Sequence, residues 1–354
     1  MKSSIMWDYM EEETDLLKRL MEDREVSEKI TVFQNMQALY IVAHGSSFNA
    51  ASAVAPMLSK LCHIRVYVYI PSNFIHNAHS LKCENKDNTW VCGISQTGTS
   101  RSVLEAVKQA KEEGFSILGI TNTVDSPMEK ISDVCCHLQC GEEDSNAKTK
   151  GYSSTLVLLW KLTLALAKQR KSISDAEIAT IRSELIDQIE YLPTLQKQTY
   201  EWCEQHRYGD HMNHLYVIGN GVNFATAMEG MLKLMETMCI PTMFSDIEEF
   251  SHGMHRSVKP DSYVILLHDG KSAEAMDKTF AYLNDKGCHT LMLNGANSQA
   301  KGNVITWKAF PHTSSLLLFT AVIQVISAFV PEAHGMDPNR NANDDYTEYM
   351  NTRI

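Results

Sequence analysis

The sequence has no surplus of basic residues and no apolar run long enough to cross a bilayer. Its 32 Lys and Arg stand against 43 Asp and Glu, a formal net charge of −11. This balance excludes broad nucleic-acid binding and attraction to anionic membranes, which both need a basic surface. The amino terminus, MKSSIMWDYMEEETDLLKRL, carries acids where a signal peptide is apolar. The apolar stretch 316–330 is shorter than the ~18 residues of a spanning helix and predicts a buried one. We therefore expect a cytoplasmic protein without a nucleic-acid or membrane partner.

The sequence also lacks the short motifs that mark metal and nucleotide sites. Nine cysteines are scattered along the chain, and the densest group, DVCCHLQC at 133–140, has no C-x-x-C pair with a second pair elsewhere. We expect Cys135, Cys136 and Cys140 to be buried free thiols. Neither G-x-G-x-x-G nor G-x-x-x-x-G-K-[ST] follows a predicted strand. The sequence therefore predicts no metal and no cofactor.

What the sequence does contain is an alternation of short apolar strands with helical segments. ALYIV, TWVCGIS and SILGITN are typical strands, and SRSVLEAVKQAKEEG is a typical helix closed by glycine. Such alternation predicts an α/β fold with parallel sheets covered on both faces. The expected parts are a helical segment at 1–35, a first domain at 36–170, a helical linker at 171–208 broken at Pro193, a second domain at 209–335 and a tail at 336–354.

The order of elements occurs twice. HLYVIGNG matches LYIVAHGSS in plan, and SYVILLHDG matches TWVCGISQTG. We therefore expect two tandem doubly wound parallel sheets. Ligands of such sheets bind beyond the carboxyl ends of the strands. This rule makes the turns at 45–47, 95–100 and 219–221 candidate ligand sites.

SQTGTS at 95–100 is the most informative short stretch. It places four hydroxyls and a glutamine between a buried strand and a helix, beside the free N–H groups of the helix start. This combination can hold a phosphate without a cation. A turn rich in Ser and Thr is also an ordinary helix N-cap, and the residues alone leave both interpretations open.

A second informative stretch runs from 229 to 258. Glu229, Lys233 and Glu236 are spaced to share one helix face, and we expect a loop after the helix to carry Glu248, Glu249, His252, His255 and Arg256. A Glu and a His in one cleft can act as general base and general acid. The alternatives are a solvated face of ion pairs and, more weakly, a metal site at His252 and His255.

Two lysines precede the expected helix in AKTKGYSSTL at 147–156. Lys148 and Lys150 lie near its positive end, so they do not complement the helix dipole. They are candidates for ligand contact, with ordinary surface lysines as the alternative.

Taken together, these motifs resemble the SIS (sugar isomerase) family, and in particular the isomerase half of glucosamine-6-phosphate synthase. The resemblance covers nearly the whole chain after about residue 35 and implies two flavodoxin-like domains. Residues that it makes phosphate-binding are Ser46, Ser47, Ser95, Gln96, Thr97 and Ser100. It makes Glu236 the catalytic base and His252 the ring-opening acid. In related proteins that histidine comes from a dimer partner, so the resemblance implies at least a homodimer.

Within the family, several segments are more similar to the glucoselysine- and fructoselysine-6-phosphate deglycases. These are WDYMEEETDLL, AHGSSFNAA, TKGYSSTL, METMCIP and the DPNR…DDY tail. No glutaminase-type segment precedes the first copy and the tail has no lysine, so the synthase reaction is not expected. The resemblance thus implies a deglycase of a 6-phosphorylated keto-amine sugar. A glucosamine-6-phosphate deaminase, an aldose–ketose isomerase and a non-catalytic sugar-phosphate sensor remain alternatives.

The resemblance and the deglycase hypothesis imply roles for further residues. Lys233 would stabilise a developing enolate oxygen, and Glu249 would orient His252. The remaining candidate substrate contacts are Gly45, Lys148, Thr149, His255 and Arg256, and Arg101 is a candidate partner for a carboxylate on the amine.

Overall fold

The computed structural model describes residues 3–296 and 298–354. The chain folds into two compact units, each with one sheet. The unit that holds the first sheet, here the N-unit, comprises Asp15–Glu143, Lys150–Arg182 and Asn341–Ile354. The C-unit comprises Met1–Thr14, Asp144–Thr149 and Ser183–Arg340. Segments 144–149 and 341–354 are therefore grouped with the sheet that is more distant in sequence, which linear domain boundaries do not anticipate.

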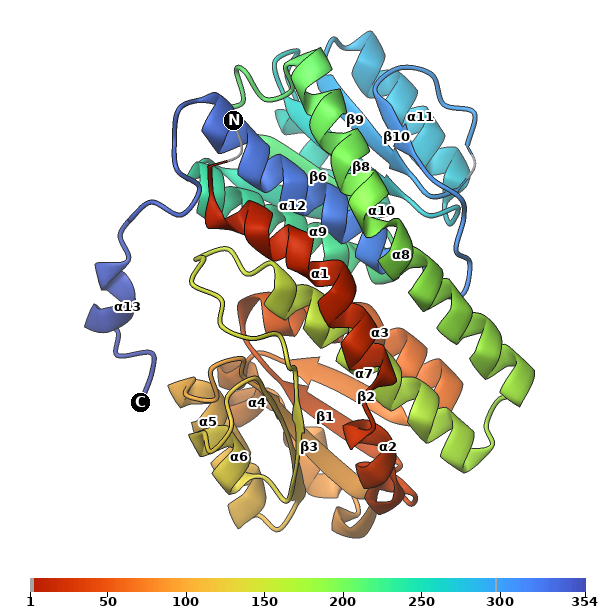
Figure 1. The fold of residues 1–354 in the computed structure, drawn as a ribbon, viewed down its shortest axis with the longest axis vertical. Coiled ribbons are helices and arrows are strands. Elements are labelled where there is room, and N and C mark those ends of the chain that lie inside the picture. Colours follow the sequence, from red (N-terminus) through yellow and green to blue (C-terminus); the bar gives the residue numbers. More distant parts are fainter. Residues whose placement is uncertain (1–2, 297) are drawn as a thin grey trace. The chain divides into compact units, whose positions relative to one another are not determined.

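The N-unit contains five parallel strands in the order β2-β1-β3-β4-β5. The strands are β1 (Ala38–Val42), β2 (Arg65–Tyr69), β3 (Thr89–Ile94), β4 (Ser116–Thr121) and β5 (Val134–His137). Its helices are α2 (Glu25–Lys29), α3 (Gly45–Cys62), α4 (Pro71–Asn77), α5 (Arg101–Glu112), α6 (Pro127–Ile131) and α7 (Lys150–Arg170). The central strands β1 and β3 are buried along their whole length, as expected of a sheet covered on both faces. Helices α3 and α7 pack side by side (Figure 1).

The C-unit repeats this plan with the strand order β10-β9-β8-β6-β7. The strands are β6 (Leu215–Gly219), β7 (Thr242–Asp246), β8 (Tyr263–His268), β9 (His289–Asn294) and β10 (Val304–Thr306). Its helices are α9 (Val222–Met238), α10 (Ile247–His252), α11 (Ala273–Asp285) and α12 (Leu316–Ala333). Numbering its strands from β6 gives the same 2-1-3-4-5 order, so the predicted pair of doubly wound parallel sheets is confirmed.

The repeat extends to single residues. Leu39 pairs with Trp90 in the first sheet, and Leu215 pairs with Tyr263 in the second. Counting from these pairs makes Gly45 equivalent to Gly221, and both have positive φ, +49° and +53°. A glycine is needed there because the chain turns sharply from the central strand into its helix.

The helices named in the sequence analysis are present, with one correction. The lead helix is α1 (Ile5–Glu22), and the apolar stretch near the carboxyl end is α12. By length and composition α12 could span a membrane, but 83% of it is buried in the protein, as in a core helix. The linker helix α8 (Asp175–His206) runs through Pro193 without a break, so the predicted break is wrong. Proline leaves the carbonyl four residues earlier without its helical donor, and the Thr14 hydroxyl donates to that carbonyl of Ile189 at 3.5 Å.

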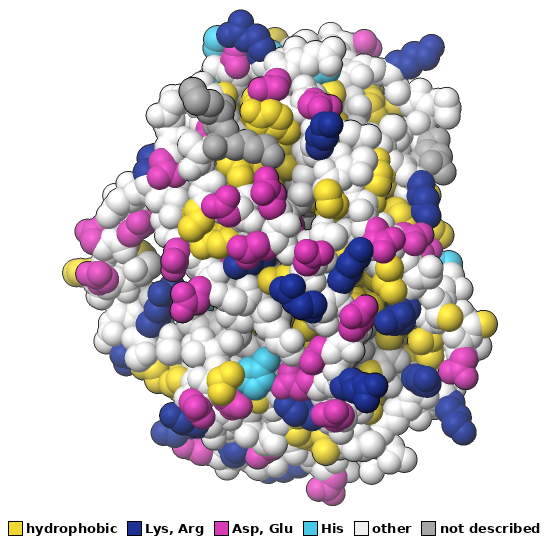
Figure 2. Space-filling view, viewed as in Figure 1, with side chains coloured by type: hydrophobic (Ala, Val, Ile, Leu, Met, Phe, Trp, Pro, Cys, Tyr) yellow, Lys and Arg dark blue, Asp and Glu magenta, His cyan; other side chains and the backbone are white. Residues whose placement is uncertain are grey.

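Charged side chains of both signs are interspersed on the face shown in the space-filling view (Figure 2). Cys135, Cys136 and Cys140 are buried free thiols, as predicted. Burial raises the pKa of Cys135 and of Cys136 to about 12 and that of Cys140 to about 11.

Candidate functional site

The first sheet has its topological switch point between β1 and β3. From β1 the chain moves to β2 on one side, and it then returns to β3 on the other side. Val42 pairs with Gly93 near the carboxyl ends of these strands. The two turns that follow, at 44–47 and 95–100, therefore meet at one edge of the sheet, where ligands of doubly wound folds bind.

Helices begin directly at both turns. Ser46 and Ser47 lie in the first turn of α3, half-buried, and Ser100 is the residue before α5. The first N–H groups of these two helices have no helical acceptor. Helix N-termini with nearby hydroxyls are suited to bind a phosphate.

The SQTGTS turn is held in a fixed shape by its own side chains. The Ser95 hydroxyl accepts a hydrogen bond from the Ser100 N–H at 3.4 Å, and Ser95 is buried. The Thr97 and Thr99 hydroxyls lie 2.9 Å apart. Ser95 therefore supports the turn, while Thr97 is exposed at its tip.

The end of the chain lies against this turn within the N-unit. The Thr99 carbonyl accepts from the Ile354 N–H and the Thr352 carbonyl from the Arg101 N–H, both at 3.1 Å. The Arg101 Nε also donates to the Asn351 carbonyl at 2.9 Å. Arg101 is thus engaged by residues 351–352, a pairing that no sequence pattern indicated.

His44 is a further residue at this edge, and the sequence analysis did not single it out. It precedes α3, and its Nε2 lies 2.7 Å from the Ser102 hydroxyl in the first turn of α5. Its side chain therefore links the two turns. Desolvation holds the pKa of this imidazole below its usual range, which favours the neutral form at pH 7.

In the C-unit, helix α9 carries a buried ion pair. The Lys233 ammonium lies 3.1 Å from the Glu229 carboxylate, and the two side chains are 0% and 1% exposed. Lys233 also donates to the Lys148 carbonyl. The alternative of a solvated ion-pair face is therefore wrong for Glu229 and Lys233. Both side chains are buried, and an unpaired charge there would be costly.

Glu236 lies one turn further along α9 and has an unusual acidity. Desolvation raises the pKa of its carboxyl to about 7, Lys233 and Lys148 lower it, and Glu229 raises it. The side chain is nevertheless reached by solvent. Both observations fit a carboxylate that protein surrounds on most sides and solvent reaches on one.

The segment that follows α9 is more ordered than the loop predicted for it. Residues 242–246 form strand β7, and Glu248, Glu249 and His252 lie on the short helix α10. The Asp246 side chain caps α10 by accepting from the Glu248 N–H at 2.8 Å. A strand and a capped helix, which replace the predicted loop, thus hold His252 in place.

The candidate residues on α10 and in the turn after it are not joined to one another by hydrogen bonds or ion pairs within the described residues. His252, Glu249 and Arg256 are all exposed. Within the described residues no hydrogen bond or ion pair joins Glu249 to His252. His255 instead bonds through Nδ1 to the Phe250 carbonyl at 3.1 Å.

Lys148 and Thr149 are largely committed within the C-unit. The Lys148 ammonium donates to the Ser145 carbonyl at 2.9 Å. Thr149 is fully buried, and its hydroxyl donates to the Ala147 carbonyl at 3.3 Å. Its carbonyl accepts from the Gln324 amide on α12 at 3.3 Å. These contacts fix the segment that Lys233 also binds.

The switch point of the second sheet, between β6 and β8, is occupied by the protein's own side chains. Asp269 is buried and accepts from the Asn223 amide at 3.1 Å. The Lys271 ammonium lies 3.4 Å from the same carboxylate and donates to the Ser314 hydroxyl at 2.9 Å. The predicted candidate turn at 219–221 therefore adjoins a charged side-chain network and carries no counterpart of the Ser46 and Ser47 hydroxyls.

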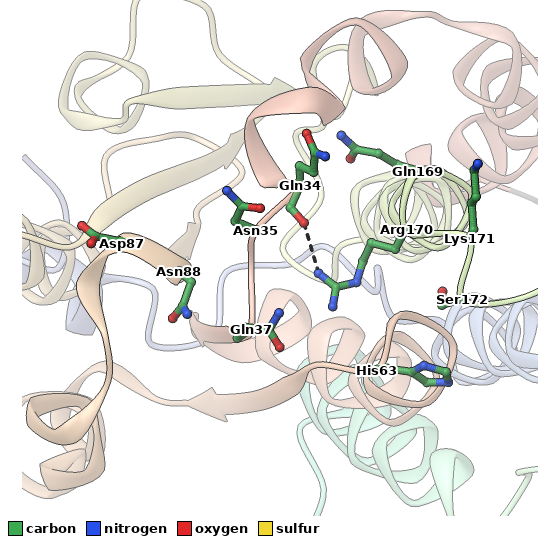
Figure 3. Close-up of a pocket in the computed structure, with 10 residues that line it drawn as sticks. All are labelled: Gln34, Asn35, Gln37, His63, Asp87, Asn88, Gln169, Arg170, Lys171 and Ser172. Atoms are coloured by element: carbon green, nitrogen blue, oxygen red, sulfur yellow. Dashed lines mark hydrogen bonds between the residues drawn. The ribbon is translucent and has the colours of Figure 1, made fainter.

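A polar groove lies at the opposite edge of the first sheet, where β1 and β3 begin (Figure 3). Its volume is about 820 Å³. Arg170 is bound to one wall through the carbonyls of Gln34 and Met36, at 3.3 and 2.7 Å. The other lining residues are Asn35, Gln37, His63, Asp87, Asn88, Gln169, Lys171 and Ser172. The groove is thus separate from the carboxyl-end site of the same sheet.

Among the described residues no group of three or more His, Cys, Asp or Glu could hold a metal ion.

Comparison with known proteins relates this architecture to one family. The SIS domain model matches residues 33–165 and 211–331. The glutamine–fructose-6-phosphate aminotransferase of Clostridium perfringens (strain 13 / Type A) is 27% identical over 342 residues, which is 93% of this chain and 55% of that protein. The chain therefore spans about half the length of the curated relatives it matches.

Solved structures share the fold over nearly the whole chain. A proposed phosphosugar isomerase from Clostridium difficile 630 superposes with a TM-score of 0.90 at 25% identity, covering 99% of both chains. The glucosamine-6-phosphate deaminase of Thermotoga maritima gives a TM-score of 0.78 at 18% identity over 96% of this chain and 98% of that one, a likeness of fold. The matches to the family model lie on the two parallel sheets described above, and this chain belongs to the SIS domain family.

Proposed function

We propose that the protein is a deglycase of a 6-phosphorylated keto-amine sugar. In this reaction His252 assists opening of the sugar ring. Glu236 removes a proton from C1, the C1–C2 double bond forms, and the C2 oxygen takes up a proton, which gives a 1,2-enaminol. Return of the proton to C2 gives an imine between C1 and the amine nitrogen. Water adds to the imine, the amine leaves, and the products are a hexose 6-phosphate and the free amine.

The observation that carries the proposal is the raised pKa of Glu236. A base works best when its pKa is near the working pH, because it is then ionised and still holds the proton well. A pKa of about 7 meets this condition, whereas an ordinary glutamate is a much weaker base. Strongly perturbed carboxylates are concentrated at functional sites.

The neighbouring charges support the same chemistry. Proton removal next to a carbonyl develops negative charge on the carbonyl oxygen. Lys233 is a buried cation that interacts electrostatically with Glu236. A buried charge stabilises a nearby opposite charge more strongly than a charge in water does. Glu229 keeps this lysine paired when no substrate is present.

The phosphate-binding part of the proposal belongs to the N-unit. The start of α3 offers backbone N–H groups, with Ser47, Thr97 and Ser100 as hydroxyl donors. Neutral donors of this kind bind a phosphate without a basic surface, which suits a chain of net charge −11. We further propose a cytoplasmic homodimer, a state that sedimentation or size-exclusion chromatography with light scattering would test.

The test is a parallel assay of the purified protein with fructoselysine 6-phosphate, glucoselysine 6-phosphate and glucosamine 6-phosphate. Release of hexose 6-phosphate and of lysine from either of the first two is the expected result. Ammonia from the third alone would identify an amino-sugar deaminase and overturn the deglycase proposal. No turnover of any of the three, with sugar-phosphate binding retained, would also overturn it and favour a sensor.

A further inference from the structure

The internal repeat makes Lys60 of α3 equivalent to Glu236 of α9. Both helices end at a residue in the left-handed conformation, His63 with φ +54° and Cys239 with φ +55°. Each of these two residues donates its N–H to the carbonyl of the fourth residue before it. The register that matches the starts of α3 and α9 therefore continues to their ends. Lys60 and Glu236 both lie three residues before the end residue, so they occupy the same position.

This position differs in charge between the two copies. A helix ends with a partial negative charge, because its last carbonyls have no helical donor. A lysine in the last turn, such as Lys60, complements that charge, whereas a glutamate opposes it. The last turn of α9 contains no basic residue. Glu236 therefore occupies an electrostatically unfavourable position unless another segment supplies a cation to the end of α9.

Arg340, in the segment after α12, supplies this cation. Its Nη1 donates to the Thr237 carbonyl at 2.8 Å, and its Nη2 donates to the Met238 carbonyl at 3.2 Å. Thr237 and Met238 are buried, and a buried carbonyl that loses its donor is costly. Arg340 thus caps the turn of α9 that carries Glu236.

Arg340 is itself held in place by the segment that precedes it. The Asp337 carbonyl accepts from the Arg340 N–H at 3.1 Å and from its Nη1 at 3.0 Å. The Asn339 side chain accepts from the Asn146 N–H at 2.7 Å and donates to the Asp144 carbonyl at 3.3 Å. These contacts fix the backbone from which the guanidinium reaches α9.

We infer that Arg340 is the positioning residue of the proposed base: by capping α9 it allows the last turn to hold Glu236 where the first copy has a lysine. The guanidinium binds backbone carbonyls of this turn, so it restrains the helix beneath the carboxylate. The charged groups that act on the carboxylate itself are Lys233 and Glu229 on α9 and Lys148. The inference rests on the proposed function, which makes Glu236 the base.

Substitution of Arg340 in the full chain tests this role, with Arg170→Met as the matched control. Arg170 also binds two backbone carbonyls through its guanidinium, but in the groove at the opposite edge of the first sheet. With the deglycase substrate, we expect Arg340→Met to lower kcat about 10- to 100-fold, because the base is displaced while the substrate still binds. KM should change less than about twofold. Arg340→Lys should lose less, since an ammonium can still donate to a helix-end carbonyl, and Arg170→Met should keep both parameters.

Two further measurements separate positioning from a general loss of stability. Hydrogen exchange followed by mass spectrometry should be faster at residues 235–239 in Arg340→Met and unchanged there in Arg170→Met. The inflection of kcat/KM with pH should move downward in Arg340→Met, because a frayed turn hydrates Glu236 and desolvation is the first cause of its raised pKa. A lowered melting temperature with kcat and the inflection unchanged would show a merely structural role and overturn the inference.

Failure of this inference and failure of the proposed reaction are distinguishable. Turnover by the unchanged protein with equal kinetics in Arg340→Met removes only the role of Arg340. No turnover by the unchanged protein removes the proposed reaction, and the exchange at residues 235–239 then decides alone whether Arg340 holds the end of α9. Unchanged exchange in a folded Arg340→Met protein would overturn the inference in either case.

Discussion

At the carboxyl end of β3, residues 95–98 read SQTG, whereas the register-equivalent residues 268–271 at the carboxyl end of β8 read HDGK. The helix starts differ in the same way, because Val222 and Asn223 of α9 stand where α3 has Ser46 and Ser47. One switch point presents hydroxyls and helix N–H groups, and the other is filled by the Asp269–Lys271–Asn223 network.

Under the proposed function, the two copies of one fold have different roles. The first copy has a neutral set of donors suited to a phosphate, with residues 351–354 lying against its 95–100 turn. The second copy closes its switch point with charges of its own, and its helix α9 carries the perturbed carboxylate Glu236 beside a buried ion pair. Substitutions in either copy test this division.

The largest effect is expected at α9. Glu236→Gln should lower kcat by about 10²–10⁴-fold, because a positioned general base contributes that much, while the affinity for sugar phosphate changes little. Steady-state kinetics together with calorimetric binding measures both quantities. Glu248→Gln, on an exposed residue of α10, is a matched control that should keep its activity. Retained turnover in the Glu236 variant would remove this residue as the base.

The next largest effect is expected at the first switch point. Ser47→Ala should weaken sugar-phosphate binding about 10-fold or more, since a hydrogen bond to a charged group contributes about 1.5–3 kcal/mol. The control is Ser272→Ala, the exposed equivalent of Thr99 in the second copy, which should leave binding unchanged. Equal losses from the two variants would break the comparison.

A smaller effect, on stability, is expected at the closed switch point. Asp269→Ala removes a buried acceptor of Asn223 and the partner of Lys271, so it should lower the free energy of unfolding by about 1–3 kcal/mol. Thr97→Ala, on an exposed residue of the first switch point, should change it by no more than about 0.5 kcal/mol. Urea unfolding followed by circular dichroism provides both values, and similar changes in the two would argue against a filled second site.

The smallest effect concerns the stability cost of Glu236. A carboxyl with a raised pKa binds its proton more tightly in the folded state than in the unfolded state. Its contribution to the free energy of unfolding is therefore full below about pH 4.5 and is lost as the pH rises through about 7. Glu236→Gln should therefore become relatively more stable than the unchanged protein across this window. Solvent around the carboxylate reduces the size of this gain. Unfolding at pH 5 and pH 8 measures it, and a gain that falls with pH would contradict the direction of the pKa shift.

Much of the fold could be predicted because buried parallel strands have continuous apolar runs. Strand β7 was missed because it is an edge strand whose residues are mostly half-buried, so its pattern is weak. The predicted break at Pro193 failed because a hydroxyl from α1, distant in sequence, binds the freed carbonyl. Tertiary contacts of this kind leave no local pattern.

The candidate site was predictable in its residue types and less so in its geometry. The turn at 95–100 lies at the switch point as the repeat implied. The burial of Glu229 and Lys233 depends on the apolar neighbours that pack around α9, which helix spacing alone does not indicate. Glu143 is 47 residues from Gln96 and Ser102 is 58 residues from His44, and only the folded chain brings these partners together.

The most direct test of the central claim is the pH dependence of kcat/KM with the deglycase substrate that the protein turns over. This parameter reports ionisations of the free enzyme. Because Glu236 must be deprotonated to act, kcat/KM should rise with pH and level off above an inflection near 7, and the residual activity of Glu236→Gln should lack that inflection. An inflection near pH 4–5, or one that persists unchanged in the variant, would contradict the assignment of Glu236 as the base.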